Sequence, residues 1–149
     1  MGAYHIISNG EQTDTIYDCL LANESFESAI NQWEFEHDPP LYTPRISGLV
    51  DVSNKQNSYK LSINKSINND PNYCVRNFYT YETAIPGIGH CIHTYESNGD
   101  SIESFNGEPF MLETFNDIDK TIDYYWNILN DDIKVAMYVK FINIQTGEY

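Results

Sequence analysis

Two short segments of this chain gather side chains that could do hydrogen-bonding or acid–base chemistry. The first is a polar turn between an apolar run and an amphipathic run. Its amide, hydroxyls and helix-start N–H groups could hold a ribose, a phosphate or a carboxamide. An ordinary capped strand–turn–helix that binds nothing is the alternative. The turn residues are Ser8, Asn9, Gly10, Thr13, Asp14 and Thr15, with Gly10 expected to allow a positive φ.

The second segment places three carboxylates, an imidazole and an arginine within a dozen residues. Glu34–Asp38 leads into Thr43, Pro44 and Arg45. A carboxylate beside a guanidinium stays ionised and could accept a proton, so Glu36 and Arg45 are candidates for an acid–base site. The alternative is a solvated, acidic helix end with Arg45 in a surface ion pair.

A third set of polar side chains lies on one expected strand. Residues 58–66 alternate, with Tyr59, Leu61 and Ile63 on one face and Lys60, Ser62 and Asn64 on the other. Lys60, with Arg76 from the next strand, could contact a substrate. A polar strand face of this kind usually faces solvent.

The elements that must position these residues follow from hydrophobic periodicity. Residues 4–8 predict a short, internal strand, and residues 13–23, 26–33 and 117–130 predict helices. Further strands are expected at 46–52, 58–66, 73–82, 88–96 and 135–144, with a hairpin turn at 97–100. The last strand is apolar on both faces and should be covered on both. The pattern indicates one α+β domain, residues 1–149, with mostly antiparallel strands.

The charge balance limits the classes of partner. The chain has 22 acidic and 8 basic residues, a formal net charge of −14. Such a surface repels nucleic acid and anionic lipid, so neither is an expected partner. No apolar run approaches the ~20 residues that span a bilayer, and three widely spaced cysteines favour reduced thiols. A cytoplasmic protein is therefore expected.

The segment His90-Cys91-Ile92-His93 invites a metal interpretation. In a strand, His90 and His93 would face opposite sides, which does not suit one ion. The helical spacing of a zinc-binding His-Glu-x-x-His motif is absent as well. No metal and no cofactor are predicted.

The turn and the segment at Arg45 together resemble the archaeal-type IMP cyclohydrolase family. Its members carry an Asn-Gly-x-x-Thr-Asp-Thr-Ile turn followed by Thr-Pro-Arg-Ile, here at residues 9–16 and 43–46. The runs 58–63, 92–95 and 105–109 support the resemblance. It implies a layered αββα sandwich similar to the N-terminal-nucleophile hydrolase fold.

The resemblance also implies an activity in purine biosynthesis. Formamidoimidazole-carboxamide ribotide (FAICAR) would close to IMP with loss of water, without cofactor or metal. Glu36 would transfer protons, Asn9 would bond the base or formyl group, and Arg45 would orient the substrate. Substrate-binding positions would be Ser8, Gly10, Thr13, Asp14, Thr15, Thr43, Lys60 and Arg76.

Family members carry a further segment upstream of the turn, so the resemblance predicts a sandwich that is incomplete at its N-terminus. Exposed sheet edges would then favour a homo-oligomer or pairing with a separate N-terminal chain. A non-catalytic nucleotide-binding or interaction domain on the same scaffold is the alternative to an enzyme.

Overall fold

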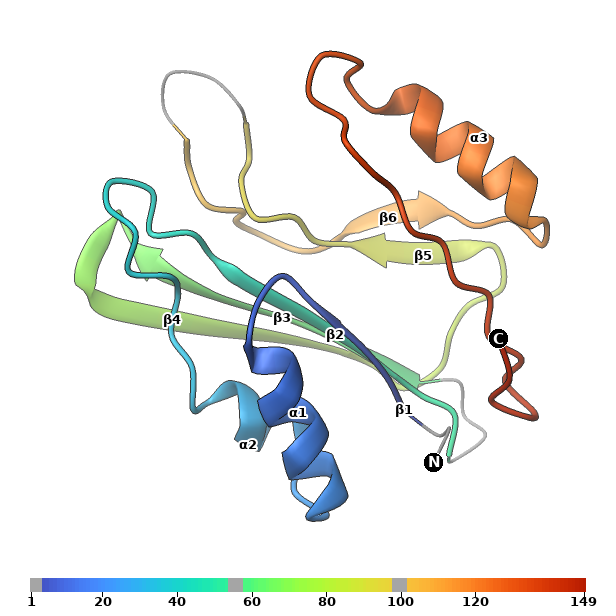
Figure 1. The fold of residues 1–149 in the computed structure, drawn as a ribbon, viewed down its shortest axis with the longest axis horizontal. Helices are drawn as coiled ribbons and strands as arrows, with labels where there is room; N and C mark the ends of the chain where they lie inside the picture. The colour runs from blue at the N-terminus through green and yellow to red at the C-terminus, as the bar shows by residue number, and fades with distance from the viewer. Residues whose placement is uncertain (1–3, 54–57, 98–101) are drawn as a thin grey trace.

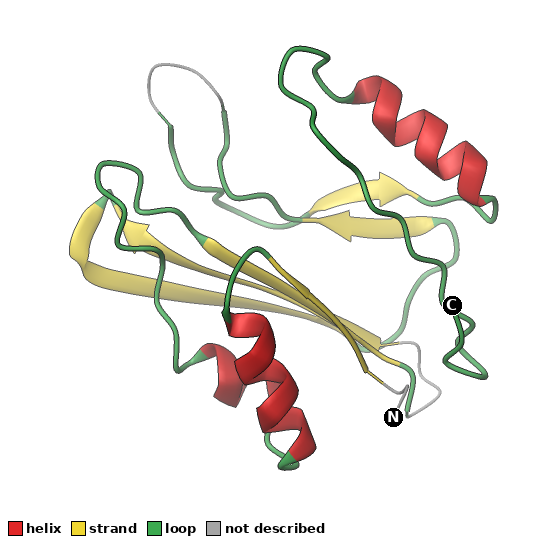
Figure 2. Ribbon diagram, in the orientation of Figure 1, coloured by secondary structure: helices red, strands yellow, loops and turns green. Residues whose placement is uncertain are grey.

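The computed structural model describes residues 4–53, 58–97 and 102–149. Within these ranges it contains a four-stranded sheet, a two-stranded sheet and three helices, which makes the chain an α+β protein (Figure 2). Every strand pair is antiparallel, as predicted. The expected hairpin turn at 97–100 lies mostly outside the described residues.

The four-stranded sheet runs in the order β1-β2-β3-β4. Its strands are β1 (Tyr4–Ser8), β2 (Arg45–Asp51), β3 (Ser58–Ile67) and β4 (Asp70–Tyr81). All four agree with the sequence prediction to within a few residues. The interior position expected for β1 is wrong, because β1 is the edge of this sheet and its Ile7 is 66% exposed. An apolar run indicates burial against neighbours but does not say on how many sides a strand pairs.

Two helices cover one face of this sheet (Figure 1). Helix α1 (Gln12–Leu21) ends where Asn23 takes a left-handed φ of 60°, a conformation that asparagine tolerates after a helix. Helix α2 (Phe26–Ile30) begins at Ser25, whose side chain accepts a hydrogen bond from the Ser28 N–H at 3.0 Å. It ends before Trp33, earlier than predicted.

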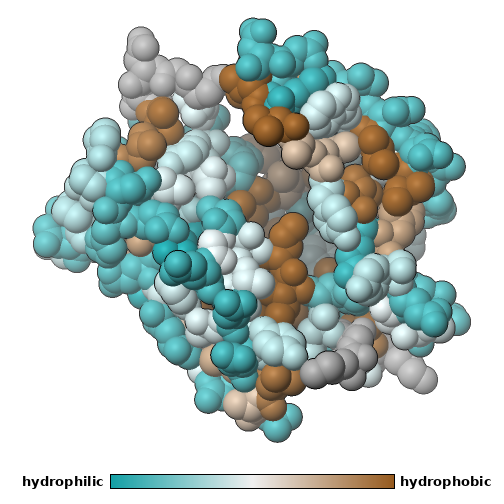
Figure 3. All heavy atoms as spheres, viewed as in Figure 1, coloured by the Kyte–Doolittle hydropathy of each residue, from teal (hydrophilic) through white to brown (hydrophobic). Residues whose placement is uncertain are grey.

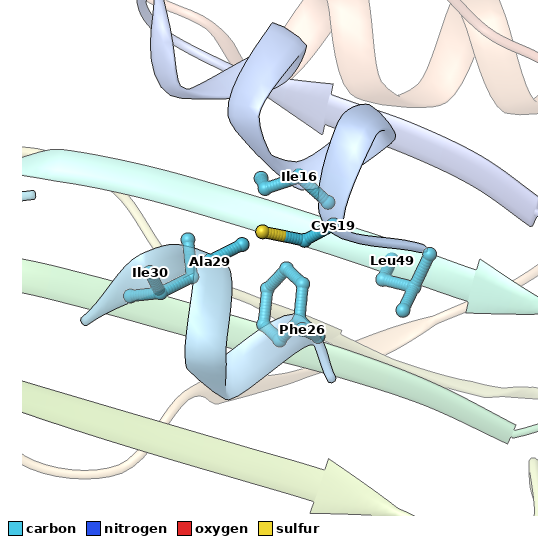
Figure 4. Packing of buried hydrophobic residues seen from close by; sticks show 6 residues of the cluster. All are labelled: Ile16, Cys19, Phe26, Ala29, Ile30 and Leu49. Carbon is cyan, nitrogen blue, oxygen red and sulfur yellow. The ribbon is translucent and has the colours of Figure 1, made fainter. Parts of the chain in front are cut away.

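The main hydrophobic core lies between these helices and the sheet. Phe26, Ala29 and Ile30 of α2 meet Ile16 of α1, and Leu49 contributes from β2 (Figure 4). Cys19 is buried in the same cluster, where burial raises the pKa of its thiol. The described part of the chain holds free cysteines at 19, 74 and 91, in agreement with the expectation of reduced thiols.

The opposite face of the sheet is covered by a second layer. Strands β5 (Ile88–Cys91) and β6 (Phe110–Glu113) pair there, and helix α3 (Ile118–Ile128) lies beyond them (Figure 1). The ring of His90 stacks on Tyr81 with centroids 3.9 Å apart and contacts the Tyr59 hydroxyl. The second layer therefore docks on the Tyr59 face of β3.

The C-terminal segment departs from the sequence prediction. Residues 135–144 form no strand, and Val135 and Tyr138 are 92% and 75% exposed. Hydrophobic side chains also show at the surface where α3 and this segment lie (Figure 3). The strand predicted for residues 135–144 is wrong, because no neighbouring strand within the described residues pairs with this segment. The burial predicted for both of its faces is wrong as well, since several of its apolar side chains are exposed. Strand β6, which that analysis did not predict, is a four-residue run without alternation.

Candidate functional site

The polar turn and the start of β2 meet through the side chain of Asn9. Its Nδ2 donates to the Pro44 carbonyl at 2.8 Å, and its Oδ1 accepts from the Ile46 N–H at 2.9 Å. The same oxygen accepts from Gln12 Nε2 at 3.2 Å. Asn9 therefore joins two segments about 36 residues apart in sequence. Both the nitrogen and the oxygen of its side-chain amide make hydrogen bonds within the protein.

Arg45 is the cation of the site and is almost buried. Its Nη1 donates to Gln12 Oε1 at 2.9 Å, and its Nη2 lies 2.8 Å from Glu36 Oε1. The guanidinium carbon lies 4.6 Å from the centre of the Trp33 ring. The side chain of Arg45 is 10% exposed, whereas that of Glu36 is 40% exposed. The arrangement presents one carboxylate to solvent, held from behind by a fixed guanidinium.

Gly10 lies against this ion pair. A β-carbon at residue 10 would be 2.5 Å from Arg45 Nη1 and 2.8 Å from Gln12 Oε1. The positive φ expected at Gly10 is wrong, since the positive-φ glycines of the described residues are 87, 107 and 147. Glycine is suited to this position by the close approach of the side chains, not by the backbone angle.

Of the remaining turn residues, Thr13 and Ser8 make hydrogen bonds within the turn. The Thr13 hydroxyl bonds the Gly10 carbonyl at 3.0 Å and also contacts the Ser8 hydroxyl. Asp14 is exposed and Thr15 is half-buried on the first turn of α1. The N-cap of α1 is Glu11, whose side chain makes no capping bond, so neither Thr13 nor Asp14 serves as the cap.

The acidic segment before Arg45, residues 34–38, has no regular secondary structure and is not the end of a helix. His37 lies 3.4 Å from Glu34, and Asp38 accepts from the Thr43 hydroxyl at 2.6 Å and its N–H at 2.7 Å. Burial would raise the pKa of Asp38, but these hydrogen bonds outweigh it and hold that pKa below its ordinary value. Each carboxylate has its own partner, and Glu36 alone of the three faces Arg45.

Lys60 and Arg76, the other predicted substrate contacts, bind protein groups on the helix-facing side of the sheet. Lys60 Nζ lies 2.6 Å from Glu27 of α2, and Arg76 donates to the Trp33 carbonyl at 2.7 and 3.0 Å. The polar face of β3 is thus buried under helices, and its usual solvent exposure does not apply here. Ser62 and Asn64 are each 1% exposed.

Sequence reasoning missed two residues that organise the site. Gln12 links Asn9 to Arg45, and Trp33 stacks on Arg45 while its carbonyl accepts from Arg76 and Asn64. Gln12 stands three residues after Asn9, a spacing that places it beside the turn once a helix begins there. For Trp33 the sequence predicted only an apolar position on a helix.

Two cavities open near this end of the sheet. One, of about 420 Å³, lies between the two sheets and is mostly apolar, with Ser8 and Asn9 in its wall beside His90 and Cys91. The other, of about 540 Å³, has a lining that is about equally polar and apolar and includes Lys65 and Ser66. The surface is visibly hollowed between the layers in Figure 3. Within the described ranges, no group of three His, Cys, Asp or Glu side chains could hold a metal ion.

None of the helices in the part of the chain that the structure describes has the length and hydrophobicity needed to cross a bilayer.

Comparison with curated proteins gave no match, and comparison with solved structures gave none either. A family model described as IMP cyclohydrolase-like protein matches residues 1–147. The chain therefore belongs to the IMP cyclohydrolase-like protein family.

Proposed function

We propose that this member of the IMP cyclohydrolase-like family closes FAICAR to IMP with loss of water, in the cytoplasm. The observation that carries the proposal is the Glu36–Arg45 pair at 2.8 Å, set beside the Asn9-Gly10 turn. The family match supports the reaction class. The pairing of a carboxylate and a guanidinium from separate segments supports the location of the site.

The reaction needs three things of the protein. The carboxamide nitrogen of the substrate attacks the formyl carbon, so that nitrogen must lose a proton and the oxyanion that develops on the formyl oxygen must be stabilised. The hydroxyl formed from that oxygen must then be protonated so that it leaves as water. Glu36 is the proposed proton carrier because its carboxylate is the reachable member of the pair. Arg45 is the group proposed to stabilise the oxyanion and to orient the substrate, and Gln12 and Trp33 hold it in place.

The Asn-Gly turn would form one wall of this site. Asn9 is proposed to contact the base or formyl group through its amide, whose Nδ2 has two N–H donors and gives one of them to the Pro44 carbonyl. The proposed binding surface continues through the other turn residues and Thr43. Substrate contacts by Lys60 and Arg76 also remain predictions.

The layers seen in Figure 1, helices on the outside and two sheets within, support a further proposal about the architecture. We propose that they belong to an αββα sandwich of the N-terminal-nucleophile hydrolase type. Self-association, or pairing with a separate chain, is proposed as the arrangement that would cover the exposed edge strands and the apolar surface near α3.

The experiment that tests the function is the ultraviolet assay of FAICAR conversion with the full chain. Turnover should fall by about 10²- to 10⁴-fold in Glu36→Gln, because a proton carrier is lost. The matched control is Glu34→Gln, a neighbouring exposed carboxylate that pairs only with His37 among the described residues. Equal activity of wild type and Glu36→Gln would exclude the assigned role.

A non-catalytic nucleotide-binding domain is the second candidate. The bonds that the Asn9 amide makes to Pro44, Gln12 and Ile46 favour it, because a side chain that holds two segments together has a structural role whether or not the site turns over substrate. Calorimetric binding of IMP by a chain that never turns over FAICAR would establish this candidate and overturn the enzyme.

A further inference from the structure

A chain of three hydrogen-bonded side chains joins the second layer to the segment that carries Glu36. The Thr43 hydroxyl donates to Asp38 Oδ2 at 2.6 Å, and the Tyr95 hydroxyl lies 2.6 Å from the same Thr43 oxygen. Thr43 and Tyr95 are 52 residues apart in sequence. Tyr95 belongs to the loop between β5 and β6, so this contact connects two layers of the fold.

The direction of each bond in this chain follows from the carboxylate at its end. Burial raises the pKa of Asp38 less than the hydrogen bonds from Thr43 lower it, so Asp38 is ionised at neutral pH and only accepts. The Thr43 hydroxyl has one proton and gives it to Asp38, so its oxygen accepts from the Tyr95 hydroxyl. Tyr95 is therefore the first donor of the chain, and phenylalanine at this position would remove that donor while keeping the ring.

The backbone of Thr43 in turn holds Glu36. The Thr43 carbonyl accepts from the Glu36 N–H at 2.9 Å, and the Thr43 N–H donates to Asp38 Oδ1 at 2.7 Å. Phe35, the residue before Glu36, is 3% exposed, so burial fixes this segment on one side. A displacement of Thr43 would shift the Glu36 backbone, whose carboxylate lies 2.8 Å from Arg45.

Tyr95 and Arg45 belong to opposite sides of the four-stranded sheet. Arg45 is opposite Asn64 in the register, and Asn64 bonds the carbonyl of Ile30 in α2, so Arg45 lies on the helix-facing side. The second layer covers the other face (Figure 1). Thr43 precedes the first residue of β2 and therefore lies beyond the end of that strand. A hydrogen bond at this point links the two sides without passing through the sheet.

Tyr95 is itself fixed by its neighbours in the second layer. His93 Nδ1 donates to the Tyr95 carbonyl at 2.5 Å, and Tyr95 forms an isolated β-bridge with Ser104. The His93 ring packs against Phe105 and Phe110, with centroids 4.7 and 5.3 Å apart. The backbone that carries the Tyr95 ring is thus anchored, and its hydroxyl can hold Thr43 in place.

We propose that Tyr95 is a positioning residue of the Glu36–Arg45 site, which acts through Thr43 and makes the activity depend on the second layer. Its effect on turnover rests on the function proposed above. Its effect on the Glu36 backbone rests on the hydrogen bonds alone, so the two effects are measured separately.

Hydrogen exchange of the Glu36 amide, followed by NMR in the full chain, tests the structural part. Tyr95→Phe and Thr43→Val should each speed this exchange about fivefold or more, because the Thr43 carbonyl that protects the amide is no longer fixed. Thr43→Ser keeps the hydroxyl and should keep the wild-type rate. Should Tyr95→Phe fail to fold, the comparison of Thr43→Val with Thr43→Ser still decides.

Tyr79→Phe is the matched control. The Tyr79 hydroxyl donates to the Gly107 carbonyl at 2.8 Å, so it also links the four-stranded sheet to the loop between β5 and β6. In the described part of the chain it makes no bond to residues 36–43. The Glu36 amide should exchange in this variant as in the wild type. An unchanged rate in Tyr95→Phe, or equal acceleration in the two tyrosine variants, would overturn the proposal.

Kinetics with FAICAR test the catalytic part. Tyr95→Phe should lower kcat about 10- to 100-fold and leave KM within about twofold, because a misplaced proton carrier slows the chemical step more than it weakens binding. In a Glu36→Gln background the same substitution should cost little more, since the group that it positions is already lost. An equal loss of kcat with and without Glu36 would overturn the positioning role.

The two proposals fail in different ways. Faster exchange of the Glu36 amide in Tyr95→Phe, in a chain without FAICAR turnover, supports the hydrogen-bond chain and removes the cyclohydrolase. FAICAR turnover that is unchanged in Tyr95→Phe supports the enzyme and removes the positioning role.

Discussion

A β-carbon on Gly10 would lie 2.5 Å from Nη1 of Arg45, closer than two such atoms can approach. The guanidinium cannot move away freely, because Gln12, Glu36 and Trp33 all hold it. The turn and the buried cation are therefore fitted to each other, and each constrains substitutions in the other.

Gly10→Ala should destabilise the protein by about 1–3 kcal/mol, the usual cost of overpacking a buried contact. Urea unfolding measures the free energy. In an Arg45→Ala background the same substitution should cost much less, because the clashing group is gone. Equal costs in the two backgrounds would show that the glycine is needed for another reason.

Asn9→Ala should lower the free energy of unfolding by about 1–3 kcal/mol, since it leaves the Pro44 carbonyl and the Ile46 N–H without their partner. Thermal or urea unfolding detects this loss. Asn127→Ala, at an exposed position of α3, is the control and should be within about 0.5 kcal/mol of wild type. A wild-type stability for Asn9→Ala would contradict the bridging role.

Asn64→Asp should destabilise the protein at neutral pH by about 1–3 kcal/mol, because it leaves two buried carbonyls without their donor. Arg45 and Arg76 lie opposite residue 64 in the sheet register and would offset part of the new negative charge. Asn64 Nδ2 donates to the Ile30 and Trp33 carbonyls at 3.1 and 2.9 Å, and a carboxylate would replace that donor with negative charge. The loss should shrink in acid, where a protonated Asp can donate again. Asn127→Asp serves as the exposed comparison, and a pH-independent loss would point to packing alone.

The Lys60–Glu27 ion pair should make stability depend on pH. Burial would raise the pKa of Glu27, but the bond from Lys60 and other hydrogen bonds outweigh it and lower that pKa below its ordinary 4.5. Its contribution is thus complete above pH 4.5 and is lost as the pH falls through the lowered folded value. The Lys60→Met variant should lose this part of the acid dependence. Parallel acid unfolding curves for the two proteins would contradict this assignment.

Much of the four-stranded sheet was predictable because its signals are local. The alternation of Tyr59, Leu61 and Ile63 against Lys60, Ser62 and Asn64 is a property of consecutive residues, and the strand adopts it. Helix α3 likewise has Asp117 as its N-cap, and the Asp117 side chain accepts a hydrogen bond from the Lys120 N–H at 2.7 Å. The predicted strand at 135–144 failed because strand formation also needs a partner.

The sequence alone therefore determined the local elements, the acidic surface and the two motifs that indicate the family. Tertiary structure decided which groups meet. Periodicity could not tell which of Glu34, Glu36 and Asp38 pairs with Arg45, or that helices cover the Lys60 face of β3. The reason is physical: local geometry sets where a side chain points along its own element. Its partner depends on how distant segments pack, and here Gly10, Gln12 and Trp33 fix that packing around a single guanidinium.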